Sequence, residues 1–578
     1  MKDQVLHCLR IALDTLIDQQ ILPAEALGKL HIERTRQSSH GDYASNIALA
    51  LAKIARCNPR QLAEQIIECV PTGDVLERCE IAGPGFINFF LKQGAYRDEL
   101  KKIRNTGLAY GECSGENLPR VMVEFVSANP TGPLHVGHGR GAAYGDALAR
   151  VLRKAGYETA TEYYVNDAGR QMDILATSVW LRYLELCGAT VDFPVNAYQG
   201  DYIFDIAATV HRENAESFLV ASADLFADLV DDPERRIDEL IDRAKRMLVG
   251  KGYQIIFEVT LHTLIGEIRS DLSHFKVDFD CWFSEKSLVT SGAIDRAVAR
   301  LAERGLLYEL DGAQWFRSSN FGDEKDRVVQ RANGAYTYFA SDIAYCLDKK
   351  ERGFDQLIYI WGADHHGYIT RTQAAFQALG HDPDEFTVLL VQFAVLYRGG
   401  EKVSMSTRGG DFVTLRELRQ EVGNDAARFF YALRKPEQHM DFDLDLAKSR
   451  SNENPVYYVQ YAHARVCSVF RQLTEKNIPH DPAGADLALL TEDAEQELMR
   501  ELSRFPEVVE SAARGFEPHQ VAYYLKDLAN YFHTYYNAHP FISSQQDVRD
   551  ARLVLIDATR QVICNGLDLL GVTAPESM

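Results

Sequence analysis

A strand, a helix and a second strand follow one another between residues 121 and 165, and this succession constrains the fold more than any other feature. Val121 to Val126 is an apolar run rich in β-branched residues. A helix is predicted from about His135 to Ala155, and after Gly156 a second strand is predicted from Thr159 to Val165. Strand, helix and strand in so short a span form a parallel crossover unit, the building block of a doubly wound sheet. The sequence therefore predicts an α/β core of the Rossmann type.

The rest of the 578 residues divides into regions of different pattern. Before the crossover unit, apolar residues at helical spacing and a strand-like run at Phe86 to Leu91 predict a small α+β module. Further strands are predicted at Leu357 to Trp361 and at Val388 to Leu396. From about Asp425 onward strand signals vanish, and helical periodicity predicts a bundle. The predicted parts are an N-terminal module at 1–112, an α/β domain at 118–400 with a helical insertion at about 175–275, a loop and connecting region at 401–424, and an all-α domain at 425–578.

The charge balance leaves the kind of partner open. The chain has 62 Lys and Arg against 83 Asp and Glu, a formal charge of −21, which by itself argues against a polyanionic partner because phosphate neutralisation needs basic side chains. Binding depends on a local patch, however, and not on the sum over the surface. Composition therefore neither supports nor excludes a nucleic acid.

Two further features of the sequence bear on the location of the protein in the cell and on the state of its cysteines. The sequence has no run of about 18 uncharged apolar residues, and Met1 opens no leader-like segment, so we expect a cytoplasmic protein with no membrane partner. The 10 cysteines are scattered, with no pair at the two-residue spacing of zinc ribbons or redox centres. We expect reduced thiols and no structural metal.

The turn between the first strand and its helix carries the sharpest local motif, His135-Val136-Gly137-His138-Gly139. Unpaired N–H groups in a first helical turn and the helix dipole both favour an anion there. Gly137 and Gly139 lack the Cβ atoms that would block its close approach. His135 and His138 add donors that can follow the charge of an α-phosphate as it becomes pentacoordinate, so both are candidate catalytic residues. The alternative is a glycine-rich helix start with two incidental surface histidines.

The same motif resembles a known family. His135 to His138 is similar to the HIGH signature of class I aminoacyl-tRNA synthetases, and the run Glu124 to Pro130 before it resembles the arginyl enzymes of bacterial type. The resemblance extends to Leu570-Gly571-Val572, near the end of the chain. It implies ligation of L-arginine to tRNA(Arg) by a monomer that uses ATP and Mg²⁺, through arginyl-adenylate and transfer to the 2′-hydroxyl of the terminal adenosine. It also implies that arginine activation needs bound tRNA.

A second segment, Gly362 to Gly367, directly follows a predicted strand. It is similar to the class I segment that holds the adenosine, where the carboxylate of Asp364 can accept from the ribose hydroxyls. A lone Gly-x-Asp would carry little weight. Together with the segment Met405 to Gly410, the resemblance implies ATP-binding roles for seven residues: Gly137, Gly139, Gly362, Asp364, His365, Met405 and Ser406.

The third segment, Met405 to Gly410, lies where the family has its mobile KMSKS loop. Here the sequence departs from the family pattern, because Ser404 and Thr407 stand where the motif has lysines. Lys402 and Arg408 are the cations available on this loop, and either could stabilise charge on the leaving pyrophosphate. Both are candidate catalytic residues, and the choice between them stays open.

Arginine makes its own demand on a pocket, because a planar guanidinium needs carboxylate partners in fork geometry and an aromatic surface. Tyr338 and Asp342 are four residues apart, which on a helix puts them on one face. The match to arginyl enzymes implies that these two meet the guanidinium. It places Ser127 and Asn129 at the α-amino and carboxylate end of the substrate, with Glu124 nearby. Glu285 is a further candidate carboxylate.

The flanking parts resemble the tRNA-binding modules of the family. Gly85-Phe86-Ile87-Asn88 is similar to the part of the N-terminal domain that packs on the tRNA elbow, where Phe86 can stack on a base and Asn88 can read its edge. Asp425-Ala426-Ala427-Arg428 is similar to the signature of the anticodon-binding bundle. Six aromatic residues crowd one later segment, and one or two of them are expected to stack on anticodon bases: Tyr523, Tyr524, Tyr531, Phe532, Tyr535 and Tyr536.

Three alternatives remain at this point. A cysteinyl-like class I synthetase shares a similar helical domain but needs a zinc site, and no Cys/His cluster is visible. A small-molecule nucleotidyltransferase could use the same histidine pair, but it leaves both flanking modules unexplained. A non-catalytic RNA-binding paralogue is favoured only by Ser404 and Thr407.

Overall fold

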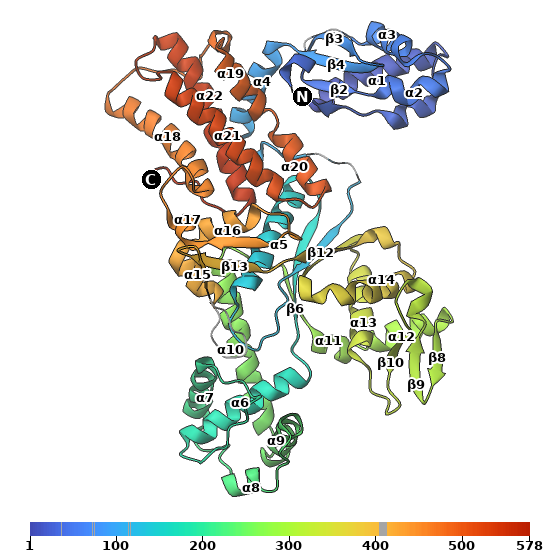
Figure 1. Ribbon diagram of the computed structural model, residues 1–578, viewed down its shortest axis with the longest axis vertical. Helices are drawn as coiled ribbons and strands as arrows, with labels where there is room; N and C mark the ends of the chain where they lie inside the picture. The colour runs from blue at the N-terminus through green and yellow to red at the C-terminus, as the bar shows by residue number, and fades with distance from the viewer. Residues whose placement is uncertain (36, 72, 74, 114, 116, 404–412) are drawn as a thin grey trace.

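The computed structural model describes residues 1–35, 37–71, 73, 75–113, 115, 117–403 and 413–578. An α/β domain lies at the centre, with the N-terminal module and the C-terminal helices at one end and a helical insertion at the other (Figure 1). Among the described helices, none is both long and apolar enough to cross a membrane.

A five-stranded parallel sheet forms the centre of the α/β domain, as predicted. Its strand order is β12-β11-β5-β6-β7, so the direction of winding reverses between β5 and β11. In open α/β sheets of this kind, ligands bind at the carboxyl ends of the strands beside the reversal. The strands are β5 (Val121–Phe125), β6 (Thr159–Val165), β7 (Cys281–Ser284), β11 (Gln356–Gly362) and β12 (Phe386–Val391).

Helices cover both faces of this sheet. Val121, Val123 and Phe125 pack toward helix α5 (Val136–Lys154), while Met122 packs with helix α13 (Tyr338–Glu351) on the other face. All five residues of β5 are buried, which is why its sequence is continuously apolar except for Glu124.

The insertion leaves the domain after β6 and returns before β7. Its helices have their own hydrophobic core, which includes Trp180 and Leu264. Tyr202 of the insertion donates to the Thr131 carbonyl oxygen at 2.6 Å, beside the turn that follows β5. The helices are α6 (Arg170–Leu186), α7 (Asp201–Asn214), α8 (Ser222–Phe226), α9 (Pro233–Met247) and α10 (Gly252–His274).

Three strand predictions need correction. A three-stranded antiparallel sheet, β10-β9-β8, was not predicted; its strands are only four residues long and barely alternate. The strand expected at 388–396 is two strands in two sheets, because the chain turns after Val391. The prediction that strands vanish after 425 is wrong, because β15 pairs in parallel with β13. The strands are β8 (Leu307–Leu310), β9 (Ala313–Phe316), β10 (Arg327–Gln330), β13 (Ala394–Arg398) and β15 (Met440–Asp443).

The flanking modules have the predicted classes. The N-terminal module packs helices on an antiparallel sheet of order β1-β2-β4-β3, in which β4 is a central strand. The strands are β1 (Glu33–Arg34), β2 (Tyr43–Ser45), β3 (Leu76–Ala82) and β4 (Phe86–Leu91). The C-terminal helices pack along one another and onto α5. They are α16 (Asn424–Ala432), α17 (Leu444–Lys448), α18 (Pro455–Glu475), α19 (Asp493–Leu502), α20 (Phe505–Arg514), α21 (His519–Ala538) and α22 (Gln546–Leu569).

Candidate active site

A cavity of about 570 Å³ opens at the carboxyl ends of β5 and β11. Its wall contains every residue expected to bind arginine: Glu124, Ser127, Asn129, Glu285, Tyr338 and Asp342. A second cavity of about 230 Å³ adjoins it and shares Ser127, Asn129 and His365. The second cavity is lined by His135, Gly137, His138, Gly362 and Asp364. The fold thus brings two groups of predicted residues to one place.

The turn after β5 shapes the boundary between the cavities. Val126 and Ser127 have φ angles of +66° and +39°, which is strained backbone for residues with side chains and costs of order 1–3 kcal/mol each. Ser127 Oγ holds the turn, because it donates to Glu124 Oε1 at 3.2 Å and accepts from the Tyr164 N–H at 3.1 Å. Asn129 then projects into both cavities, with its Nδ2 donating to Gln171 at 2.8 Å.

One acidic side of the larger cavity is already neutralised by protein cations. Glu124 Oε2 accepts from the fully buried Lys349 at 2.5 Å, and Lys349 Nζ lies 3.8 Å from Glu162. Arg352 donates twice to Glu162, at 2.6 and 3.0 Å. Burial alone would raise the pKa of Glu162, but Lys349 and Arg352 lower it overall. Glu124 therefore reaches the cavity as part of a balanced ion network.

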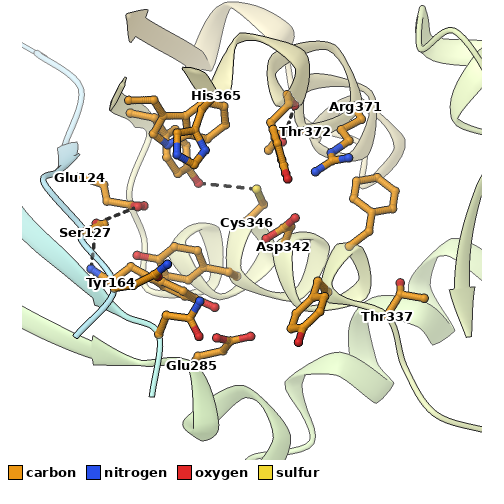
Figure 2. Close-up of a pocket in the computed structure, with 18 of the residues that line it drawn as sticks. Glu124, Ser127, Tyr164, Glu285, Thr337, Asp342, Cys346, His365, Arg371 and Thr372 are labelled. Atoms are coloured by element: carbon orange, nitrogen blue, oxygen red, sulfur yellow. Dashed lines mark hydrogen bonds between the residues drawn. The ribbon is translucent and has the colours of Figure 1, made fainter. Parts of the chain in front are cut away.

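The other acidic side lacks such partners. Within the described parts of the chain, neither Asp342 nor Glu285 forms an ion pair within 4.0 Å. Burial raises the pKa of Asp342 to about 7, with Arg371 opposing and Glu285 and Glu124 adding to the rise. Burial and Asp167 likewise raise the pKa of Glu285 to about 7. Figure 2 shows Glu124, Asp342 and Glu285 facing the same cavity from β5, α13 and helix α11 (Glu285–Thr290).

Tyr338 begins α13 and stands at the mouth of the cavity, 62% exposed. Thr337 caps this helix: its Oγ1 accepts from the Ala340 N–H at 3.4 Å and donates to the Val328 carbonyl oxygen at 2.8 Å. A Cβ on Gly169 would lie 3.0 Å from the Tyr338 hydroxyl, so glycine there gives the ring room. The predicted four-residue spacing does place Tyr338 and Asp342 on one face of α13.

Three arginines that line the larger cavity were not predicted from the sequence: Arg327, Arg331 and Arg371. Arg371, on helix α14 (Ile369–Ala378), lines the larger cavity with its guanidinium 3.5 Å from the centre of the Tyr368 ring. Figure 2 shows it beside Asp342. Its signal in the sequence is its position, one helical turn after the segment Gly362 to Gly367.

The histidine pair caps the helix that it begins. The Gly137 N–H donates to His135 Nδ1 at 3.1 Å, and the His135 N–H donates to His138 Nδ1 at 3.3 Å. The rings stack with centroids 3.7 Å apart. Burial lowers the pKa of both, that of His138 to about 3. Since each Nδ1 accepts, each neutral ring carries its proton on Nε2.

Glycine is required at three positions near the site, but a side chain would be excluded by different neighbours at each. A Cβ on Gly137 would lie 2.8 Å from Phe393 and 2.9 Å from the His135 ring, and one on Gly362 would lie 2.4 Å from Asp364 Oδ1. The reason given above for Gly139 needs correction. Its Cβ would lie 2.8 Å from Leu415, and it does not line either cavity, so it lets helix α15 (Leu415–Val422) pack against α5.

The loop predicted to hold the pyrophosphate is only partly within the described residues. Met405, Ser406 and Arg408 lie outside them, as do Ser404 and Thr407. Lys402 lies in the two-residue strand β14, exposed, and lines neither cavity. The far end of the loop reaches the histidine helix, because the Val136 N–H donates to the Val413 carbonyl oxygen at 3.2 Å.

The residues predicted to contact tRNA differ in accessibility. Phe86 is 41% exposed, whereas Asn88 is 7% exposed between Ala44 and Glu80 in the sheet. Phe86 is thus the accessible member of the pair, and burial of Asn88 speaks against its reading a base edge. In the crowded aromatic segment, Tyr523 and Tyr531 are exposed, while three others are buried: Tyr524, Phe532 and Tyr535.

Known families match almost the whole chain. The arginyl tRNA synthetase N terminal domain matches residues 6–91, the catalytic domain of class I (R) tRNA synthetases matches 100–436, and the DALR anticodon binding domain matches 459–578.

Individual relatives agree with these matches. The arginine–tRNA ligase of Thioalkalivibrio sulfidiphilus is 57% identical over 586 residues, and that of Hydrogenovibrio crunogenus is 53% identical over 592, each covering all of both chains. The crystal structure of a putative arginyl-tRNA synthetase from Campylobacter jejuni superposes with a TM-score of 0.71 at 32% identity, over 84% of this chain and 100% of that one. The synthetase of Thermus thermophilus shares the fold, with a TM-score of 0.72 at 24% identity over 98% and 100% of the two chains. On its sequence and its fold, the chain belongs to the class I arginyl-tRNA synthetase family.

Proposed function

We propose that the two adjoining cavities join L-arginine to tRNA(Arg) at the expense of ATP, the activity for which the relatives are named. The larger cavity takes the amino acid and the smaller takes the phosphates. One observation carries this assignment: among the described residues Asp342 and Glu285 form no ion pair within 4.0 Å, and their cavity opens beside the paired histidines.

In the larger cavity, the guanidinium of the substrate lies between Asp342 and Glu285, with the Tyr338 ring over it. Two carboxylates and an aromatic face are the groups that a planar, delocalised cation prefers. The α-amino and carboxylate groups then point to Ser127 and Asn129, two of the residues that both cavities share. The carboxylate of the substrate thereby reaches the nucleotide.

In the smaller cavity, Gly362, Asp364 and His365 hold the adenosine, and Gly137, His135 and His138 face the phosphates. The arginine carboxylate attacks the α-phosphorus in line, the bond from that phosphorus to the bridging oxygen breaks, and pyrophosphate leaves. Mg²⁺, when bound, would neutralise charge on the leaving pyrophosphate. Neutral imidazoles that carry their protons on Nε2 can donate to the phosphate oxygens as charge develops. We assign the pyrophosphate to Lys402, Arg408 and the residues Met405 and Ser406.

In the second step, the 2′-hydroxyl of the terminal adenosine attacks the activated carbonyl and AMP leaves. No side chain is assigned as the base, because positioning alone can supply much of the rate. Phe86 on the N-terminal module, and Tyr523 and Tyr531 on the bundle, are exposed aromatic rings on which unpaired tRNA bases can stack. We propose a cytoplasmic monomer that needs bound tRNA to activate arginine.

The direct test is to offer total tRNA and twenty labelled amino acids, one at a time. We expect only arginine to be charged, and charging with any other amino acid would overturn the assignment of Asp342 and Glu285. A chain that binds tRNA but charges nothing would be the non-catalytic paralogue.

A second test isolates the histidines. We expect His138→Ala to slow single-turnover adenylate formation about 100-fold or more, the usual effect of removing one transition-state donor. His7→Ala is the matched control, because His7 is exposed and lines neither cavity, and it should change the rate less than twofold. An unchanged rate in His138→Ala would remove the histidines from the mechanism.

A further inference from the structure

The segment Asp425 to Arg428, although it resembles an anticodon-domain signature, lines neither cavity. Arg428 is fully buried where α16 meets three other parts of the chain. Its Nε donates to the Leu570 carbonyl oxygen at 2.8 Å, its Nη1 to the Phe275 carbonyl oxygen at 2.9 Å, and its Nη2 to Asp146 Oδ2. One guanidinium therefore ties α16 to the end of α22, to the end of the insertion and to the histidine helix α5.

The surroundings of Arg428 are shaped for a forked cation. Gly571 has a φ of +66°, and a Cβ there would lie 2.3 Å from Arg428 Nη2. Burial lowers the pKa of Arg428, and Asp146 opposes that shift. A lysine ammonium has its three donors on one atom and lacks the planar fork that fits these acceptors.

A second contact joins α16 to α5 one turn further along. The buried Tyr431, three residues after Arg428 and so on the same face of α16, donates to the Val136 carbonyl oxygen at 3.0 Å. Val136 is the first residue of α5, directly after His135. α16 thus holds α5 both at the histidine end and at Asp146.

The other end of the signature faces the bundle. Asp425 accepts from Gln460 of α18 at 2.9 Å and from the Thr573 N–H at 3.1 Å. It also pairs with Lys276 at 3.3 Å. A shift of α18 against the α/β domain can therefore be transmitted to α5 through α16, beside the direct packing of α20 and α22 on α5.

We propose that Arg428 is a positioning residue for arginine activation, through which tRNA held on the bundle aligns the histidine helix with bound ATP. The inference rests on the function proposed above, in which His135 and His138 face the phosphates. A physical coupling of this kind requires a contiguous rigid path between the two sites, and the helices α18, α16 and α5 with their hydrogen-bonded joints form one.

The test uses the full chain and measures ATP–pyrophosphate exchange at saturating arginine and ATP. Exchange is measured once with full-length tRNA and once with a minihelix that has the acceptor stem but no anticodon arm. In the wild type we expect full-length tRNA to stimulate exchange at least tenfold more than the minihelix. In Arg428→Lys we expect kcat with full-length tRNA to fall at least tenfold, so that the exchange rates with the two RNAs become nearly equal. The KM values for arginine and ATP should stay within twofold of the wild type.

The matched control is Arg552→Lys. Arg552 is also buried, at 8% exposed, but among the described residues its hydrogen bonds stay within the C-terminal domain, to Glu495 at 2.8 Å and the Pro540 carbonyl oxygen at 3.2 Å. It should lower the melting temperature and leave the RNA ratio unchanged. If Arg428→Lys does not fold, Asp146→Asn replaces it, since the amide keeps the shape and removes the charge.

Three results would overturn the proposal. Arg428→Lys, or Asp146→Asn in its place, could keep the wild-type ratio of exchange rates with the two RNAs. Arg552→Lys could lose that ratio equally, or the wild type could exchange equally fast with both RNAs. The proposed function is judged separately, by whether the wild type forms arginyl-adenylate at all.

Discussion

Two groups of carboxylates lie at the larger cavity, one of them extended by Glu162 behind its wall, and their surroundings act on them in opposite ways. Glu124 and Glu162 are buried with Lys349 and Arg352, so the pKa of Glu162 is lowered despite burial. Asp342 and Glu285 have no ion pair within the described parts of the chain, and their pKa values rise to about 7. A buried carboxylate without a cation is unfavourable unless a ligand supplies one. The comparison separates the carboxylates that are paired within the protein from those that we propose bind the substrate.

The largest effect should come from removing a cation from the ion network of Lys349, Arg352, Glu124 and Glu162, and it should be an effect on stability. Lys349→Met leaves Glu124 and Glu162 short of a buried cation, and we expect it to lower the free energy of unfolding by about 3–5 kcal/mol, measured in urea. Lys350→Met is the control, because Lys350 is the next residue and pairs with Glu385 at the surface. The double variant Lys349→Met/Glu124→Gln should recover part of the loss. A Lys349→Met chain of unchanged stability would show that the network is not structural.

Removing a carboxylate that has no ion pair, Asp342 or Glu285, should weaken arginine binding without lowering the stability of the fold. Asp342→Asn removes a charge partner of the guanidinium, and we expect kcat/KM for arginine to fall about 100-fold or more, with stability unchanged or increased. Glu351→Gln, on the exposed side of the same helix, should change kcat/KM less than twofold. If Asp342→Asn instead destabilises the chain and leaves KM alone, the two groups of carboxylates are not distinct.

The raised pKa values of Asp342 and Glu285 predict that rising pH lowers the stability of the free protein but strengthens arginine binding. The folded chain keeps protons on Asp342 and Glu285 up to about pH 7, whereas the unfolded chain releases them near pH 4. Without arginine, these groups should therefore make the fold less stable as pH rises from about 4 to about 7. The KM for arginine should fall about tenfold from pH 6 to pH 8, because the ionised forms bind. In Asp342→Asn and Glu285→Gln the KM profile should flatten; an equally steep profile would assign the titration elsewhere.

The smallest effect concerns the part of the site that carries no charge. Tyr338→Ala should weaken arginine binding by about 1 kcal/mol, the usual value of a cation–π contact at a partly exposed ring. Tyr338→Phe keeps the ring and should change the KM for arginine less than twofold. If the phenylalanine variant is as weak as the alanine variant, the hydroxyl and not the ring face binds the substrate.

Much of this arrangement could be predicted from the sequence. The first crossover unit has long, strongly patterned elements, and the pair Tyr338 and Asp342 has a spacing that a helix turns into one face. Pairings between distant segments could not be predicted. Nothing local indicates that Lys349 reaches Glu124, or that Arg428 reaches Asp146, because each pair meets only after the sheet and helices have packed. The short strands 307–316 and 440–443 were missed for the same reason, since they are defined by their partners and not by their composition.

The strained turn at Val126 and Ser127 bears on adaptation to temperature. Glycine at position 126 would relieve the unfavourable backbone angle and slow unfolding. It would also loosen Ser127, which we propose meets the α-amino end of the substrate, so faster amide hydrogen exchange should appear at residues 125–129 together with slower turnover. A thermophilic relative would gain more by strengthening the surrounding packing than by relaxing this one turn.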